Sequence, residues 1–227
     1  MKKLILFVTV LTTLGATAQT KSELQKHYEA YYNQMKKQGD VQGVINAMTH
    51  LDVLSPSQAR RDTIAYLYIS ENQNVQALNT IGVDKNATDS DLNVEVKAIA
   101  LKGLNQPKRA LEHYEVLFTR KPNPYLAYEM ADLKLQVLDV PGAQKDIEYG
   151  LANVKDDMKY AFYETQQPYE TSLKAALLYL KALAIYNEDK NANTELALAT
   201  LNRALAIDPN FNLAKISKDA LLRKPKE

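Results

Sequence analysis

The stretch Leu92–Pro122, LNVEVKAIALKGLNQPKRALEHYEVLFTRKP, decides how this chain folds. Apolar residues recur in it at spacings of three and four, which predicts two short amphipathic helices. The segment Leu104–Pro107 interrupts that pattern and is typical of a tight turn between the two helices. Pro122 ends the second helix, because the residue before a proline is biased away from helical geometry. The stretch therefore predicts a helical hairpin.

The second helix of this hairpin opens on a small residue that recurs in phase along the chain. Its equivalents lie 33 residues apart and are Val44, Ala77, Ala110 and Ala143. Internal repetition at a period of about 20–50 residues is the signature of solenoids and similar arrays. Packed helix axes lie about 8–10 Å apart, and the side chains at the crossing set that distance, so a small residue there permits close packing. The fold class predicted is all-α, with hairpin stacked on hairpin.

Five hairpins and a terminal helix can be placed on this register. The repeats cover about residues 25–58, 58–91, 91–124, 124–155 and 172–210, and an amphipathic capping helix covers 211–223. The insert 156–171 breaks the register, so that the next residue of the same type, Ala197, lies 54 residues after Ala143. Disordered linkers are poor in aromatic residues, whereas this insert carries Tyr160, Phe162, Tyr163 and Tyr169. We therefore expect it to pack back on the solenoid as an irregular or helical element.

This pattern resembles the tetratricopeptide repeat (TPR) family, whose unit of about 34 residues is a helix–turn–helix with small residues at two fixed places. In the third unit these places fall on Ala98 and Ala110, the bulky position on Tyr114 and the closing proline on Pro122. The chain departs from the family pattern in having no tryptophan, and its second and fourth units lack the closing proline. The resemblance implies a right-handed α-solenoid of about five TPR-like hairpins plus a C-terminal capping helix.

Residues 1–18 have the three parts of a secretory signal peptide. Lys2 and Lys3 are the basic part, Leu4–Leu14 is the apolar run, and Ala16–Ala18 is a small-x-small cleavage sequence. The apolar run is too short to span a bilayer, which takes about 20 helical residues. We expect cleavage before Gln19 and an exported solenoid of residues 19–227, without a transmembrane segment, in a bacterial periplasm, at the cell envelope or secreted.

The composition disfavours several classes of function. With 28 Lys and Arg against 27 Asp and Glu, the chain lacks the excess of basic residues that nucleic-acid binding requires. The three histidines, His27, His50 and His113, fall in separate predicted helices and lack the spacing of zinc ligands. Nucleophile-elbow, phosphate-loop and dinucleotide motifs are missing. We therefore expect no catalytic residues, no metal and no cofactor, and predict that the protein is not an enzyme.

The resemblance also implies a binding surface, because in TPR arrays the first helix of each unit lines a concave groove. Mapping the groove positions onto this chain gives a set rich in tyrosine. The candidate partner-binding residues are Tyr66, Glu95, Tyr125, Tyr128, Asp132, Tyr179 and Tyr186. Tyrosine suits recognition because it offers a large amphipathic area with few rotatable bonds. The competing interpretation is that the next repeat or the insert buries some of these rings.

The function predicted is that of an exported, non-enzymatic scaffold that binds a protein or peptide through the concave face. One alternative is a protein that binds a carbohydrate or another small ligand by stacking it on the groove tyrosines. The other is an enzyme, or the regulatory subunit of an envelope enzyme, with its site in the insert 156–171. No nucleic-acid partner is expected.

Overall fold

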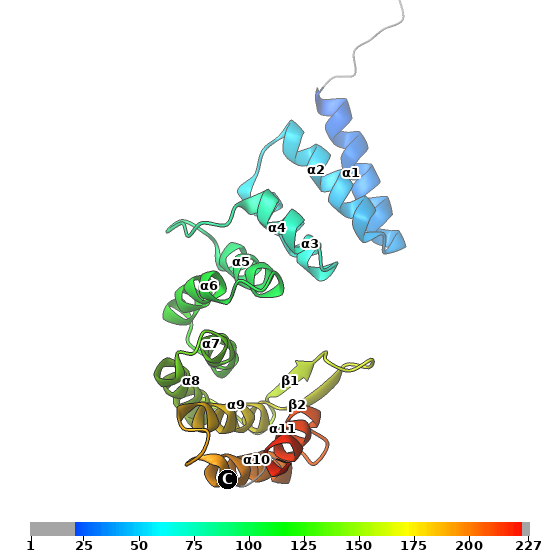
Figure 1. The fold of residues 1–227 in the computed structure, drawn as a ribbon. Coiled ribbons are helices and arrows are strands. Elements are labelled where there is room, and N and C mark those ends of the chain that lie inside the picture. The colour runs from blue at the N-terminus through cyan, green and yellow to red at the C-terminus, as the bar shows by residue number, and fades with distance from the viewer. Residues whose placement is uncertain (1–20, 224–227) are drawn as a thin grey trace, which may run out of the picture.

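The computed structural model describes residues 21–223, so the predicted signal peptide lies outside the described residues. Within them the chain forms eleven helices and one pair of strands (Figure 1). The first eight helices are α1 (Lys21–Gln38), α2 (Val41–Leu54), α3 (Gln58–Ser70), α4 (Asn74–Ile81), α5 (Asp91–Gly103), α6 (Pro107–Arg120), α7 (Pro124–Gln136) and α8 (Val140–Asn153). They are followed by β1 (Lys159–Phe162), β2 (Tyr169–Ser172), α9 (Leu173–Glu188), α10 (Thr194–Ile207) and α11 (Asn212–Leu222).

Consecutive helices pair as hairpins, from α1 with α2 through to α9 with α10, and α11 packs on α10. The hairpins stack into a curved array, in which α3, α5 and α7 follow one another along the inner side of the arch (Figure 1). Over residues 21–223, this confirms the predicted all-α solenoid of five helical hairpins and a terminal helix. None of the helices in this range is long and apolar enough to cross a membrane.

The 33-residue period is visible in the backbone of the turns. One residue in the turn after the first helix of each of the first four hairpins has a positive φ, namely Gly39 (71°), Asn72 (58°), Asn105 (55°) and Leu138 (63°). Glycine and asparagine tolerate this left-handed conformation, whereas other side chains collide with the following carbonyl oxygen. Leu138 therefore adopts a conformation that its side chain disfavours.

Small residues lie where neighbouring helices cross. The alanines at the two small-residue positions of units two, three and four are fully buried: Ala65, Ala77, Ala98, Ala110, Ala131 and Ala143. Beside them Tyr114 is 4% exposed and packs with Leu117 in the central apolar cluster. The repeat positions assigned from the sequence are thus the residues that set how closely the helices approach.

A buried carboxylate joins the second unit to the third. Asp62 of α3 is 4% exposed and accepts hydrogen bonds from the Nδ2 of Asn93 and the Oγ of Ser90, each at 2.7 Å. Gln58 donates to the same carboxylate at 2.8 Å. Because the carboxylate is satisfied only when both units are in place, these contacts fix how α3 lies against α5.

Two buried side chains hold the loop between α4 and α5. The Nζ of Lys97 lies 2.6 Å from a carboxylate oxygen of Asp89 and donates to the carbonyl oxygen of Asp84 at 2.9 Å. The Nε2 of His113 lies 3.1 Å from the carbonyl oxygen of Val83. These contacts order a polar segment that would otherwise have few partners.

The insert packs back on the solenoid as expected, but the expectation of an irregular or helical element is wrong. It forms an antiparallel β-hairpin in which Lys159 pairs with Ser172 and Phe162 with Tyr169. Successive side chains of a strand point to opposite faces, and Phe162 on one of these faces is buried in the core cluster of the last units. β2 runs directly into α9 without an intervening loop.

Candidate functional site

α7 carries three of the seven predicted groove residues, Tyr125, Tyr128 and Asp132. The side-chain oxygen of Asn123 caps this helix by accepting the backbone N–H groups of Tyr125 and Leu126, each at 3.0 Å. Tyr128 and Asp132 lie four residues apart on the helix, which places them on the same face. That face meets α9 and the β-hairpin.

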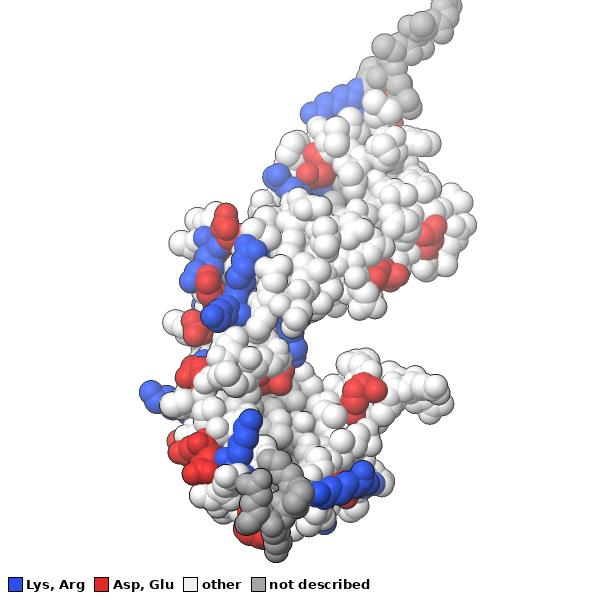
Figure 2. Space-filling view, viewed as in Figure 1, with Lys and Arg blue, Asp and Glu red and all other residues white. Residues whose placement is uncertain are grey.

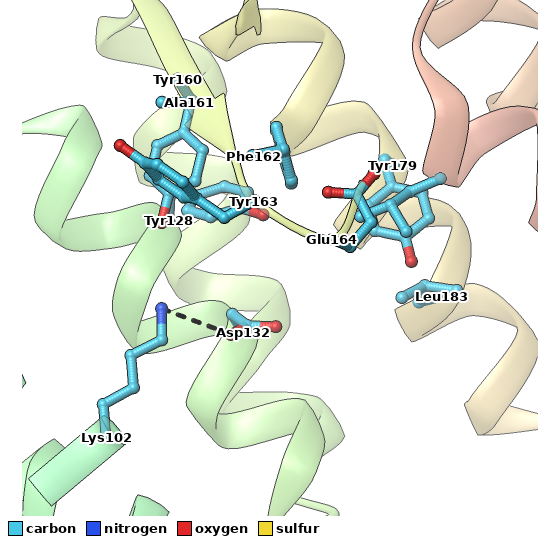
Figure 3. Close-up of a pocket in the computed structure, with 11 residues that line it drawn as sticks. Lys102, Tyr128, Asp132, Tyr160, Ala161, Phe162, Tyr163, Glu164, Tyr179 and Leu183 are labelled. Carbon is cyan, nitrogen blue, oxygen red and sulfur yellow. Dashed lines mark ion pairs between the residues drawn. The ribbon is translucent and has the colours of Figure 1, made fainter. Parts of the chain in front are cut away.

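A cavity of about 310 Å³ lies between α7, α9 and the hairpin (Figure 3). Its lining comes from α5 and α7 (Lys102, Tyr128, Asp132), from the hairpin (Tyr160, Ala161, Phe162, Tyr163, Glu164) and from α9 and α11 (Tyr179, Leu183, Leu213). Five lining residues are aromatic. The volume is at the lower end of the range of about 300–1,000 Å³ usual for small-molecule pockets, which suits one large side chain or a small ligand.

The hairpin covers Tyr128, so for this ring the competing interpretation, burial by the insert, describes the structure. Tyr128 is 4% exposed, and its ring centroid lies 4.2 Å from that of Tyr160 and 6.3 Å from that of Phe162. Phe162 in turn packs against Phe211 at 5.1 Å. What remains exposed of Tyr128 borders the cavity.

Acidic side chains outnumber basic side chains at the cavity and its border. The Nζ of Lys102 lies 2.5 Å from the Oε2 of Glu129 and 3.8 Å from the Oδ2 of Asp132. The hydroxyl of Tyr160 donates to the other oxygen of Glu129 at 2.5 Å. Burial raises the pKa of the Asp132 carboxyl, and the attraction of Lys102 opposes that rise. Glu164 contributes a third carboxylate, so the cavity and its border carry more negative than positive charge.

Only part of the predicted groove set lies at this cavity. It brings together three of the seven candidates, Tyr128, Asp132 and Tyr179. The other four lie elsewhere on the first helices: Tyr66 (48% exposed) on α3, Glu95 (exposed) on α5, Tyr125 (39% exposed) on α7 and Tyr186 (half-buried) on α9.

The hairpin residues of the cavity were not among the site residues predicted from the sequence. Tyr160, Phe162, Tyr163 and Glu164 belong to the insert, for which the TPR pattern has no position. A signal for them was present, because aromatic residues alternate with small or polar ones at Lys159–Phe162. Such alternation over a short run is typical of a half-buried strand.

No protein-family model and no curated protein sequence matches this chain. Solved structures do match it. A tetratricopeptide repeat protein from Parabacteroides merdae ATCC 43184 superposes with a TM-score of 0.65 and 13% identity, covering 88% of this chain and 72% of that one. YrrB, described as a TPR protein with an unusual peptide-binding site, superposes with a TM-score of 0.65 and 15% identity, covering 85% of this chain and 90% of that one.

A third similar structure, the Cut9–Hcn1 hetero-tetramer of the APC/C, gives a TM-score of 0.56 at 13% identity and covers 91% of this chain and 37% of that one. At these identities the likeness concerns the fold. It confirms the TPR-like helical repeat that the 33-residue register predicts.

Proposed function

We propose that this protein is an exported, non-enzymatic scaffold that binds a protein or peptide, with recognition centred on the cavity between α7, α9 and the β-hairpin. The observation that carries the proposal is this cavity, lined by aromatic rings and carboxylates, on the inner side of a TPR-like solenoid. Aromatic side chains that line a pocket are the usual anchors of protein interfaces. The structural likeness to YrrB, whose description names a peptide-binding site, is consistent with it.

A non-enzymatic role is supported by the arrangement of the titratable groups at the cavity. Lys102 is engaged with Glu129, which also accepts the Tyr160 hydroxyl. Burial and the nearby Glu129 carboxylate raise the pKa of the Tyr160 phenol, which keeps it a hydrogen-bond donor. These contacts give each group a positioning role, and none of them pairs a nucleophile with a general base.

Export is proposed from residues 1–18, whose basic, apolar and small-residue parts have the order of a signal peptide. We expect mass spectrometry of the protein recovered from the cell envelope or medium to show an N-terminus at Gln19. Recovery of the exported protein with Met1 intact would contradict this.

Site-specific photo-crosslinking in the producing cell tests the binding function. A photoreactive phenylalanine analogue replaces Tyr163, which is 75% exposed at the cavity. The matched control carries the analogue at Glu148, an exposed residue of α8 outside the cavity. We expect a stoichiometric protein adduct from position 163 and none from position 148. Equal adducts from both positions would contradict the proposal, and retention on glycan resin without any protein adduct would favour the carbohydrate alternative.

A further inference from the structure

The outer edge of β1 in the β-hairpin has no partner strand among the described residues. Within residues 21–223 the sheet consists of β1 and β2 alone. The N–H of Leu173 donates to the carbonyl oxygen of Met158 at 2.9 Å, which makes these two a hydrogen-bonded pair. Hydrogen-bonded and non-hydrogen-bonded pairs alternate along an antiparallel ladder. Lys159 and Ala161 therefore direct their backbone N–H and C=O groups away from β2.

This free edge adjoins the cavity. Ala161 is one of the residues that line it, between Tyr160 and Phe162. Figure 3 shows the chain from Tyr160 to Glu164 passing along one side of the cavity, with the Lys102–Asp132 ion pair on the other. In Figure 1 β1 lies on the side of the hairpin that faces the opening of the arch. In Figure 2 this opening is a deep notch in the surface, wide enough in that view to leave the hairpin uncovered.

The groups inside the cavity specify what an added strand would insert there. The Oδ2 of Asp132 accepts from Gln136 at 3.0 Å, and Lys102 lies closer to Glu129 than to Asp132. The carboxylate of Asp132 therefore retains capacity to accept hydrogen bonds. Tyr128, 4% exposed, borders the same space, and a tyrosine hydroxyl can accept a hydrogen bond as well as donate one.

Arginine fits this combination best. Its guanidinium offers several N–H donors in a planar fork and stacks on aromatic faces, so it can donate to Asp132 and to the Tyr128 hydroxyl while lying among the tyrosine rings. The excess of carboxylates over the single Lys102 favours a cationic occupant. The volume of about 310 Å³ accommodates one such side chain.

We propose that an extended peptide adds to the free edge of β1 as a third strand and inserts an arginine side chain into the cavity beside Asp132. This inference rests on the proposed function and specifies its partner. In such strand addition, main-chain hydrogen bonds supply affinity and a side-chain pocket supplies specificity. The backbone groups of Lys159 and Ala161 receive the strand, while Asp132, Tyr128 and Tyr179 receive the side chain.

The experiment selects a phage-displayed library of random linear dodecapeptides on the exported chain, residues 19–227. The selected peptides are synthesised and titrated by fluorescence anisotropy. We expect them to share an arginine within an extended segment, and we expect its replacement by the neutral isostere citrulline to weaken binding about tenfold or more.

Two pairs of variants separate the pocket from the strand edge. Asp132→Asn should weaken the arginine peptides about tenfold and leave the citrulline peptides unaffected, whereas Glu148→Gln on α8 should change neither. Ala161→Pro removes an N–H from the free edge of β1 without removing a ladder hydrogen bond. Its control is Glu170→Pro, at the paired position on β2, which alters only the opposite edge. Only Ala161→Pro should abolish binding, and circular dichroism and thermal unfolding verify that both variants fold.

Methylation of every second backbone nitrogen of the peptide tests the strand edge again without altering the protein. Two alternating patterns are possible, and only the pattern that blocks the N–H groups facing β1 should abolish binding. This inference would be overturned if the selected peptides showed no preference for arginine, or if they bound the parent and Ala161→Pro with equal affinity. Either result would leave the scaffold function intact. Failure to select any peptide would also overturn it. The scaffold function itself falls if position 163 yields no protein adduct in the crosslinking experiment, or no more adduct than position 148.

Discussion

At the scale of single residues, Leu138 shows how the repeat constrains the backbone. It occupies the turn position that Gly39, Asn72 and Asn105 occupy in the other units, with a φ of 63°. A left-handed conformation costs an ordinary residue about 1–2 kcal/mol, and the Leu138 side chain is 78% exposed and gains little from packing.

Leu138→Asn should therefore stabilise the protein by about 1 kcal/mol, because asparagine tolerates the left-handed region. Urea denaturation of the parent and the variant measures the difference. Val53→Asn is the control, since Val53 is 76% exposed in a helix, where the two residue types have similar propensities. A Leu138→Asn variant no more stable than the parent would show that the turn is not strained.

His113 should make stability depend on pH. Its Nε2 carries the proton that the carbonyl oxygen of Val83 accepts, and its Nδ1 is buried without a partner. Burial lowers the pKa of His113 below its ordinary value of 6.5. The unfolded chain therefore binds a proton more readily than the folded one, so stability falls as the pH drops through about 6.5 towards the folded pKa.

Between pH 8 and pH 5.5 we expect the parent to lose more stability than His113→Gln, which keeps an N–H donor for Val83 but does not titrate. Urea denaturation at a series of pH values compares the two slopes. Parallel curves would contradict the assignment.

At the scale of the elements, Tyr128 is the residue that fastens the hairpin to α7. Because it is buried beneath Tyr160 and Phe162, Tyr128→Ala should leave a cavity and destabilise this region by about 3–5 kcal/mol, as large aromatic truncations in cores do. Native-state digestion with chymotrypsin should then cleave the hairpin faster than in the parent. Tyr125→Ala, one turn away and 39% exposed, should be cleaved no faster than the parent, and rapid cleavage of both variants would refute the fastening role.

The elements also show what the sequence could predict. Helices and turns followed from the 33-residue register, because Ala98 and Ala110 mark helix crossings and the hairpin turns recur at Asn72 and Asn105. The hairpin could not follow from that register, since strand pairing depends on contacts with the last units, such as Phe162 with Phe211. For the same reason, only part of the candidate site could be predicted from the sequence. α7 and α9 could be aligned from the repeat, whereas the strands that close the cavity over them could not.

At the scale of the whole molecule, the apolar core is uneven. The cluster formed by the last units extends from α7 through the hairpin to α11, while the first units share a small cluster of Ile45, Met48 and Ile64. Because each unit contacts mainly its neighbours, the stability of such an array is local. Hydrogen exchange should therefore be fastest in α1 and α2 and slowest in α9 and α10, and uniform protection would show that the array unfolds as one unit.

Asp62 joins the second unit to the third, between the two ends of this gradient. Asp62→Ala removes the acceptor shared by Ser90 and Asn93, and a buried polar group left without a partner costs about 1–3 kcal/mol. Exchange measured by mass spectrometry should accelerate in α1 to α4 and stay unchanged in α9. Thr63→Ala, at an exposed neighbouring position, should leave all helices as in the parent, and acceleration in α9 with Asp62→Ala would contradict this local coupling.

The direct junction of β2 with α9 has a consequence for the size of the ligands that the arch admits. Since no loop separates strand from helix, the hairpin is a direct extension of the last units, while α3 belongs to the second unit, across the opening of the arch (Figure 1). The hairpin and α3 are connected only through the stacking of the units between them. A small rotation at one interface between these units therefore produces a larger displacement at the tip of the hairpin, because the tip lies far from that interface. The hydrogen bonds of Asp62, remote from the cavity, thus help to set the width of the opening.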